Sequence, residues 1–242
     1  MRVPRIYTQQ NLIEGRELEL DGAASHHLVT VLRMAAGRSV CVFNGDGEEY
    51  EATIVELRKK IAVLKIGSSR EGVSESPLRS TLAVGISRGD RFDFALQKAT
   101  ELGVHCIVPL FCERSEVKLT GDRLDKKMDA WKKIIIGACE QSGRVKLPDL
   151  SASHSFVDYA ASEKSALKLV LHHRADKKLS ALPKPDSVAV LIGPEGGLSE
   201  TEIQLAQQQG FQALRLGPRV LRTETAPLAA LTTLQLLWGD FA

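Results

Sequence analysis

A stretch rich in glycine is the first place in this sequence where residue types and spacing could do chemistry. Residues 192–199, called the glycine loop here, hold three glycines within five positions, so a ligand could approach their backbone N–H groups closely. Ser199 and Glu202 predict a capping box for a helix directly behind it, whose positive end would face the same ligand. The loop matches neither the G-x-G-x-x-G nor the Walker A pattern, and a plain turn before a capped helix explains it equally well.

A second candidate stretch is residues 216–226, called the arginine loop here, which joins an expected strand to an expected helix. It contains two arginines, two threonines and a glutamate. A solvated loop in which Thr225 caps the following helix is the simplest interpretation. That interpretation leaves the apolar pair Val220 and Leu221 unexplained, so we expect this part of the loop to fold inward.

Other reactive residues give weaker signals. Residues 111–115 and 140–144 mix charged with small side chains, which is more typical of surface loops than of sites. The pairs at 26–27 and 172–173 are adjacent histidines, whose side chains point in different directions and cannot bind one metal ion together. The four cysteines fit no zinc spacing, so we predict no metal, and buried, reduced thiols at Cys41, Cys106 and Cys139.

The N-terminal part of the chain has the pattern of a small β domain. Alternating apolar residues predict strands at 38–43, 49–57 and 61–66. A short helix is expected to begin with Ser25 as its N-cap and to end at Gly37. The polar segment 68–77 has no periodicity and predicts a linker. These features indicate a small β-barrel domain over residues 1–70.

After the linker the pattern changes to alternating strands and helices, which predicts an α/β domain with a mainly parallel sheet over residues 78–242. Ligands of such sheets bind at the carboxyl ends of the strands, where both candidate loops would lie. Pro109 is expected to end a strand, and Pro227 lies where the first turn of the last helix is expected. The strands are expected at 81–86, 104–110, 167–171, 188–192 and 213–216. The helices are expected at 91–102, 124–139 and 199–210, with a last helix that follows Thr225 and ends at Trp238.

The composition narrows the class of protein. The chain has 242 residues, a formal net charge of +2 and 26% charged residues. This balance excludes a cationic coat over the whole protein, so any nucleic-acid binding must use a local patch. No apolar run approaches the about 18 residues of a membrane span, and no signal peptide follows Met1, so we expect a cytoplasmic protein.

The two loops resemble those of one family, the bacterial 16S ribosomal RNA uridine N3-methyltransferases of the SPOUT superfamily. Supporting matches lie at 27–33, 98–103, 113–115 and 141–144, so the resemblance covers nearly the whole chain. It implies a PUA-like barrel at 1–70 and a SPOUT-type α/β domain at 78–242 that is threaded as a deep trefoil knot. It also implies a homodimer that acts on 16S rRNA. Free rRNA and the assembled small ribosomal subunit both stay open as the form of the substrate, and we expect the assembled subunit.

The same resemblance implies S-adenosylmethionine as the cofactor. This ligand has no phosphate, so it needs exposed loop backbone rather than the lysine of a P-loop. The resemblance places cofactor binding in the two loops and at the end of the strand 167–171. The predicted cofactor-binding residues are Leu171, His172, Gly193, Glu195, Gly196, Gly197, Leu216, Gly217, Leu221, Arg222, Thr223 and Ala226.

Methylation at N3 of uracil needs the imide proton removed or the imide charge stabilised. Arg222 is a candidate for stabilising the uridine anion electrostatically. Glu224 either orients Arg222 or accepts the proton, and the sequence leaves both roles open beside that of an acidic residue favoured at a helix N-terminus. The candidate RNA contacts, each otherwise an ordinary surface charge, are Arg2, Arg5, Arg33, Arg88, Arg114 and Arg144.

Two other functions stay open. In one, a non-catalytic RNA-binding protein carries a degenerate methyltransferase domain; the intact loop motifs argue against it. In the other, the chain is an enzyme that acts on a small-molecule nucleotide, and the N-terminal barrel would then have no evident function.

Overall fold

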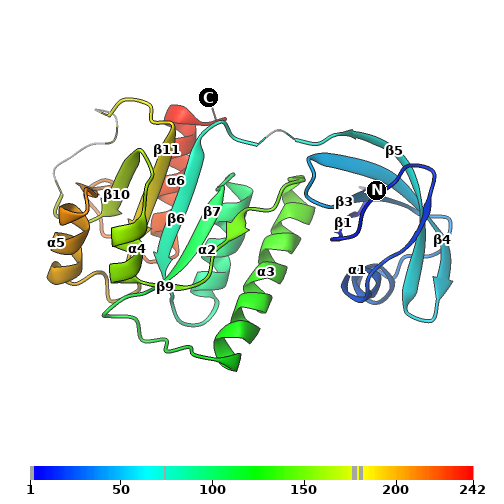
Figure 1. Cartoon of the computed structure of the whole chain (residues 1–242), viewed down its shortest axis with the longest axis horizontal. Helices are drawn as coiled ribbons and strands as arrows, with labels where there is room; N and C mark the ends of the chain where they lie inside the picture. Colours follow the sequence, from blue (N-terminus) through cyan, green and yellow to red (C-terminus); the bar gives the residue numbers. More distant parts are fainter. Residues whose placement is uncertain (1–2, 74, 176–178, 180–181, 242) are drawn as a thin grey trace. The chain divides into compact units, whose positions relative to one another are not determined.

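The computed structural model describes residues 3–73, 75–175, 179 and 182–241 (Figure 1). The chain forms two compact units. The N-terminal unit comprises Met1–Glu75 together with Ile136–Leu147, and the C-terminal unit comprises Ser76–Ile135 and Pro148–Ala242. The later segment of the N-terminal unit has no counterpart in the domain prediction from sequence, which treated each domain as one continuous stretch.

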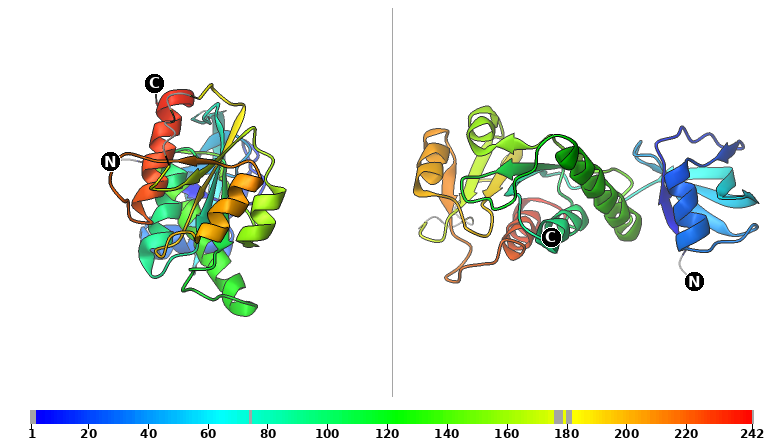
Figure 2. Two further views of the ribbon diagram at one scale, coloured as in Figure 1. Left: turned by 90° about the vertical axis from the view of Figure 1, so that its left-hand side faces the viewer. Right: turned by 90° about the horizontal axis from the view of Figure 1, so that it is seen from below.

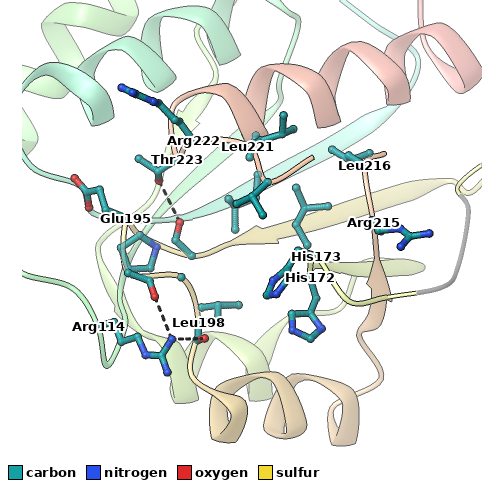
Figure 3. Close-up of a pocket in the computed structure, with 18 of the residues that line it drawn as sticks. Arg114, His172, His173, Glu195, Leu198, Arg215, Leu216, Leu221, Arg222 and Thr223 are labelled. Carbon is teal, nitrogen blue, oxygen red and sulfur yellow. Dashed lines mark hydrogen bonds between the residues drawn. The ribbon is translucent and has the colours of Figure 1, made fainter. Parts of the chain in front are cut away.

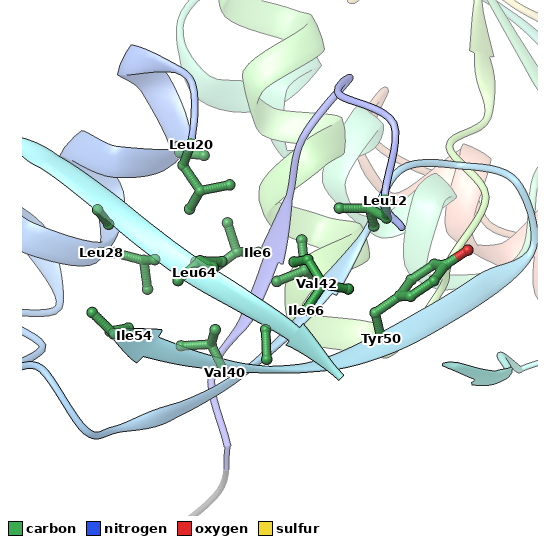
Figure 4. Packing of buried hydrophobic residues seen from close by; sticks show 13 residues of the cluster. Ile6, Leu12, Leu20, Leu28, Val40, Val42, Tyr50, Ile54, Leu64 and Ile66 are labelled. Carbon is green, nitrogen blue, oxygen red and sulfur yellow. The ribbon is translucent and has the colours of Figure 1, made fainter. Parts of the chain in front are cut away.

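The N-terminal unit is built on a five-stranded sheet in the order β1-β3-β4-β5-β2, in which only the pairing of β1 with β3 is parallel. Alternation along β4 buries Tyr50, Ala52 and Ile54 on one face, as the sequence predicts. These residues join a closed apolar core with side chains from β3, β5 and α1 (Figure 4). The bounds are β1 Arg5–Tyr7, β2 Glu17–Glu19, α1 Gly22–His26, β3 Ser39–Phe43, β4 Glu48–Arg58 and β5 Ile61–Glu71.

The helix of this unit begins earlier than expected. The N-cap is Asp21, whose Oδ1 accepts hydrogen bonds from the N–H groups of Ala23 and Ala24, both at 3.0 Å. Ser25, the predicted cap, is instead buried and donates its hydroxyl to Leu20 O at 2.9 Å. After α1 the chain continues as a π-helix, η1 (His27–Val31), and Arg33 then takes a left-handed conformation with φ 51°. The helical segment therefore ends well before Gly37.

Hydrogen bonds explain why residues 136–147 belong to the N-terminal unit. This segment contains the end of helix α3 (Asp122–Ser142). Glu140 Oε1 accepts the Tyr7 N–H at 3.0 Å, and Gly143 O accepts from Arg5 Nη2 at 3.1 Å. Backbone and side-chain groups of β1 thus find their partners about 130 residues later in the chain.

The C-terminal unit is an α/β fold around a seven-stranded sheet in which every described pairing is parallel. The strand order is β12-β10-β11-β6-β7-β8, with β9 also paired to β7. Figure 2 shows α4 and α5 on one face of this sheet and α2 and α6 on the other. The bounds are β6 Arg79–Gly85, α2 Asp90–Glu101, β7 Cys106–Phe111, β8 Asp149–Leu150, β9 His154–Ser155, α4 Phe156–Ser162, β10 Leu167–Leu171, β11 Ser187–Ile192, α5 Glu200–Gln208, β12 Gln212–Leu214 and α6 Thr225–Trp238.

The order of the strands brings the two candidate loops together. Strand β12 lies at the edge beside β10, whereas α6 contacts α2 and β11. The chain between them therefore crosses the carboxyl ends of β10 and β11, which is the kind of passage that a knotted α/β domain needs. The glycine loop follows β11, so the arginine loop passes directly over it.

Most of the predicted bounds differ from the observed ones by a few residues, and two of the differences have structural reasons or extend far. Strand β5 continues to Glu71, into the expected linker 68–77. Pro109 lies inside β7, paired with Val84, instead of ending the strand. Its nitrogen faces the side where β8 has ended at Leu150 and β9 has not yet begun, so no ladder hydrogen bond is lost there.

The cysteines are free thiols. Cys139 is buried as predicted, but Cys41 and Cys106 are half-buried, and Cys112 is the second buried thiol. Burial raises the pKa of Cys139 to about 11 and that of Cys112 to about 12, so both stay protonated. Among the described residues, no helix is both long and apolar enough to span a membrane.

Candidate functional site

A cavity of about 700 Å³ lies in the C-terminal unit at the carboxyl ends of β10, β11 and β12. The segment after β10, the glycine loop and the arginine loop form its walls (Figure 3). All the predicted cofactor-binding residues line this cavity except Gly217. The structure thus brings together residues that lie up to 55 positions apart, from Leu171 to Ala226.

The glycine loop is folded tightly on itself. The Gly197 N–H donates to Pro194 O at 2.8 Å, and Gly197 has a φ of 68°, which a residue with a side chain adopts only under strain. A Cβ at Gly193 would lie 2.8 Å from Leu198 N. At Gly196, a Cβ would lie 2.9 Å from the Cβ of Arg114. The contact with Arg114 therefore already requires glycine at position 196, whether or not a ligand approaches there as the sequence suggested.

Arg114 holds this loop from the end of β7. Its Nη1 donates to Gly196 O at 3.1 Å and to Leu198 O at 3.3 Å. Next to it, the Glu113 N–H donates to Glu202 Oε1 at 2.8 Å. The sequence suggested Arg114 as an RNA contact, but the structure engages its guanidinium with the carbonyls of the loop.

The predicted capping box is confirmed. Ser199 Oγ accepts the Glu202 N–H at 3.2 Å, and Glu202 Oε2 accepts the Ser199 N–H at 2.8 Å. The Glu202 carboxylate is buried and so joins the end of the glycine loop, the start of α5 and the turn after β7.

The arginine loop is fixed to the glycine loop through Thr223, whose hydroxyl donates to Gly193 O at 3.2 Å. The Arg222 carbonyl accepts the N–H groups of Thr225 and Ala226, both at 2.9 Å, and so begins α6. Glu224, not Thr225, occupies the N-cap position, and no side chain caps it, so the predicted cap is wrong. The expected inward turn is also wrong for Val220, which is 79% exposed.

The two predicted catalytic residues differ in their surroundings. Arg222 is exposed, and Figure 3 shows its guanidinium on the outer side of the loop, away from His172 and Leu216. Glu224 Oε2 is buried and, among the described residues, has no hydrogen-bond partner. The Nε of Arg91 lies 4.0 Å from it. Arg91, rather than Arg222, is thus the cation that faces this carboxylate.

Arg91 also reaches the glycine loop, and sequence reasoning missed it. Its Nη1 donates to Glu195 Oε1 at 3.1 Å, and the Arg88 N–H donates to the same oxygen at 2.8 Å. Burial acts to raise the pKa of Glu195, but hydrogen bonds from its own N–H, from Arg88 and from Arg91 outweigh it and lower the pKa. The signal that could have pointed to Arg91 was a basic residue in the first turn of the helix that follows the strand 81–86.

His172 lies on the cavity wall after β10. Its backbone N–H donates to Leu214 O at 2.9 Å, which ties β10 to β12. Burial, and then the neighbouring His173, lower the pKa of the His172 imidazole. We therefore expect a neutral ring there at pH 7. Among the described residues, no three His, Cys, Asp or Glu side chains are grouped so that they could hold a metal ion.

The remaining RNA-contact predictions divide by exposure. Arg2 lies outside the described residues. Arg5 and Arg144 have side chains only 11% and 9% exposed, in ion pairs with Glu49 and Glu75. Both therefore serve the packing of the N-terminal unit, and the structure does not favour them as RNA contacts. Arg33 and Arg88 are exposed; the Nη1 of Arg88 lies 2.8 Å from Glu116 Oε2.

Family models match both units. A model described as an RNA methyltransferase domain matches residues 74–235, and one described as an RNA methyltransferase PUA domain matches residues 20–67. The chain thus has the two domains of an RNA methyltransferase with a PUA domain. More narrowly, the chain belongs to the ribosomal RNA small subunit methyltransferase E family. A relative of that name from Bacillus subtilis (strain 168) is 35% identical, with 96% of each chain covered.

Solved structures agree with this assignment and confirm the predicted fold class. A protein from Legionella pneumophila, solved in complex with the bound cofactor SAM, is 45% identical with a TM-score of 0.97 over 100% of both chains. A ribosomal RNA small subunit methyltransferase E from Neisseria gonorrhoeae, bound to S-adenosyl methionine, is 39% identical with a TM-score of 0.92 over 100% of both chains.

Proposed function

We propose that this chain transfers the methyl group of S-adenosylmethionine to N3 of a uridine in 16S rRNA of the small ribosomal subunit. The observation that carries the proposal is a buried carboxylate oxygen on Glu224 that accepts no hydrogen bond from the described residues, on a residue that lines the cavity of the two loops. The family of the chain and the SAM-bound structures of its relatives support the cofactor and the rRNA substrate.

The residues of the cavity fit this cofactor. Leu171, Ile192 and Leu216 supply apolar surface suited to an adenine ring, and the exposed backbone of the glycine loop supplies hydrogen-bonding groups. Arg174 and Arg215 also line the cavity and could hold the carboxylate of the methionyl part. When bound, the cofactor supplies an electrophilic methyl group on a sulfonium.

Glu224 and Arg222 would have different roles in the reaction of the uracil imide. The N3–H becomes strongly acidic as the new N–C bond forms, so a carboxylate suffices to accept its proton. We assign that proton to Glu224 Oε2, because no other group of the described chain donates a hydrogen bond to it. Arg222, exposed at the end of the same loop, would stabilise negative charge on the uracil oxygens.

We further propose a homodimer. Leu236 and Leu237 on α6 are 57% and 41% exposed, and a second copy of the chain could cover them. We also propose that the enzyme acts in the cytoplasm, because the proposed substrate is the small ribosomal subunit. Light scattering at micromolar concentration should give twice the mass of the chain, and a monomer would contradict this part of the proposal.

The test is single-turnover methylation of small ribosomal subunits from a strain that lacks this activity, with cofactor binding measured by calorimetry. We expect Glu224→Gln and Arg222→Ala to lower the rate at saturating cofactor and subunits by at least about tenfold, with little change in either affinity. The wild-type rate in both variants would remove these residues from catalysis. A wild-type protein that binds subunits, but that neither binds the cofactor nor transfers methyl groups, would favour the non-catalytic RNA-binding alternative.

A further inference from the structure

A second hollow adjoins the cofactor cavity. It is open and encloses about 780 Å³ at the start of α2. Arg91, Glu195 and Glu224 line both spaces, so the two spaces meet at these residues. A group-transfer enzyme needs adjoining donor and acceptor sites, because the reacting atoms must come into contact.

The lining of the hollow combines three kinds of chemistry. Arg88 and Arg91 provide positive charge, with side chains 66% and 48% exposed. Each is paired with a carboxylate of the same lining, Arg88 with Glu116 and Arg91 with Glu195. Phe94, one helical turn after Arg91, is 42% exposed, which is high for a phenylalanine. The third component is Glu224, whose buried Oε2 has no hydrogen-bond partner among the described residues.

Each component matches one part of a nucleotide. A phenylalanine ring stacks on the face of a base, and guanidinium groups bind phosphate oxygens. An unpartnered carboxylate oxygen can accept a hydrogen bond from a ring N–H, which uracil carries at N3 and cytosine lacks. Exposed arginines beside an exposed aromatic ring are typical of surfaces that bind single-stranded nucleic acid.

We propose that this hollow is the subsite for the acceptor nucleotide, a uridine turned out of the rRNA, whose base stacks on Phe94. The inference rests on the proposed function and assigns the binding site of the uridine acceptor to this hollow. Arg88 and Arg91 exchange their carboxylate partners Glu116 and Glu195 for the flanking phosphates, and Glu224 accepts a hydrogen bond from the imide N–H. In the transfer the bond from N3 to the methyl carbon forms, the bond from that carbon to sulfur breaks, and the N3 proton passes to Glu224 Oε2.

The experiment compares Phe94→Ala and Phe94→Trp with the wild type. A matched control is Phe241→Ala, because Phe241 is 45% exposed but does not line the hollow. Affinity is measured for small ribosomal subunits from a strain that lacks the methyltransferase, with cofactor affinity by calorimetry and mass by light scattering. Stacking of one base predicts that Phe94→Ala weakens subunit binding by about 5- to 150-fold. Cofactor affinity and mass should stay unchanged, Phe94→Trp should restore binding, and Phe241→Ala should behave as the wild type.

Three results would overturn the inference. They are unchanged subunit affinity in Phe94→Ala, an equal loss of cofactor affinity, and a change of mass, which would assign Phe94 to an interface between protomers. Subunit binding requires no turnover. A wild type that fails to methylate would therefore refute the proposed function without deciding the role of Phe94, and the reverse also holds.

Discussion

Removal of the Arg114 side chain should loosen the glycine loop and weaken cofactor binding. Arg114 Nη1 donates to two carbonyls of that loop, Gly196 O at 3.1 Å and Leu198 O at 3.3 Å. Because Arg114 is exposed, each bond should contribute about 0.5–1 kcal/mol, below the range for buried charged groups. If the cofactor binds only the observed loop conformation, a loss of about 1–2 kcal/mol raises its Kd roughly 5- to 30-fold.

The assay is calorimetric titration of Arg114→Ala and Arg114→Lys with S-adenosylmethionine, using Arg88→Ala as the matched exposed arginine. Arg114→Lys should recover part of the affinity, because an ammonium group donates hydrogen bonds without the planar geometry of the guanidinium. Arg88→Ala should leave the cofactor Kd unchanged, since the contact of Arg88 with Glu195 runs through its backbone N–H.

Salt dependence of subunit binding separates this role from the one that the sequence suggested. A residue that neutralises one phosphate lowers the slope of log K against log salt by about one unit when it is removed. We expect that change in Arg88→Ala and not in Arg114→Ala. An unchanged cofactor Kd together with a reduced salt slope in Arg114→Ala would refute the loop-holding role and restore Arg114 as a phosphate contact.

Three further predictions concern the same unit. Gly197→Ala should cost about 1–2 kcal/mol from its left-handed φ of 68°, whereas Gly196→Ala should cost stability through its clash with the Cβ of Arg114. In urea unfolding, only the Gly196→Ala cost should shrink in an Arg114→Gly background, which removes that Cβ. The pKa of Glu195 is lowered in the folded protein, so the ionised carboxylate stabilises the fold above the ordinary carboxyl pKa, and this stabilisation is lost as the pH falls through the lowered value. Glu195→Gln should therefore flatten the acid limb of the profile of unfolding free energy against pH. An identical profile in the two proteins would contradict this. Buried Gln235 accepts a hydrogen bond from Ser76 Oγ at 2.6 Å and donates one to Leu102 O at 2.9 Å. Gln235→Leu should therefore destabilise the folded protein by about 1–3 kcal/mol. A loss too small to shift the urea midpoint would show that these bonds contribute little.

The features predicted correctly from sequence depend on local signals. The capping box needs only Ser199 and Glu202 three positions apart, and the alternation along 49–57 needs only neighbouring residues. The meeting of the two loops followed from a general rule about the ends of parallel strands. The two loops that these signals singled out supply most of the residues that line the cavity, whereas Leu171 and His172 were indicated only by the family resemblance.

What sequence reasoning missed depends on contacts between distant residues. Arg91 and Glu195 are 104 positions apart, and nothing local to either indicates that they touch. Arg5 and Arg144 have the residue type of RNA contacts, yet each has a carboxylate partner that only the fold supplies. Pro109 ends strands in most contexts, but here the neighbouring strand is interrupted opposite its nitrogen.

The N-terminal unit is built from two separate segments of the chain, and this has a consequence for folding during synthesis. Ile136–Leu147 completes a unit whose other residues end at Glu75, so the ribosome must make 60 intervening residues before this unit can close. Until then the Tyr7 N–H lacks its acceptor on Glu140. A fragment that ends at Glu75 should therefore be less stable than the same unit in the full chain, and co-translational folding of the N-terminal unit should wait until residue 147 has left the exit tunnel.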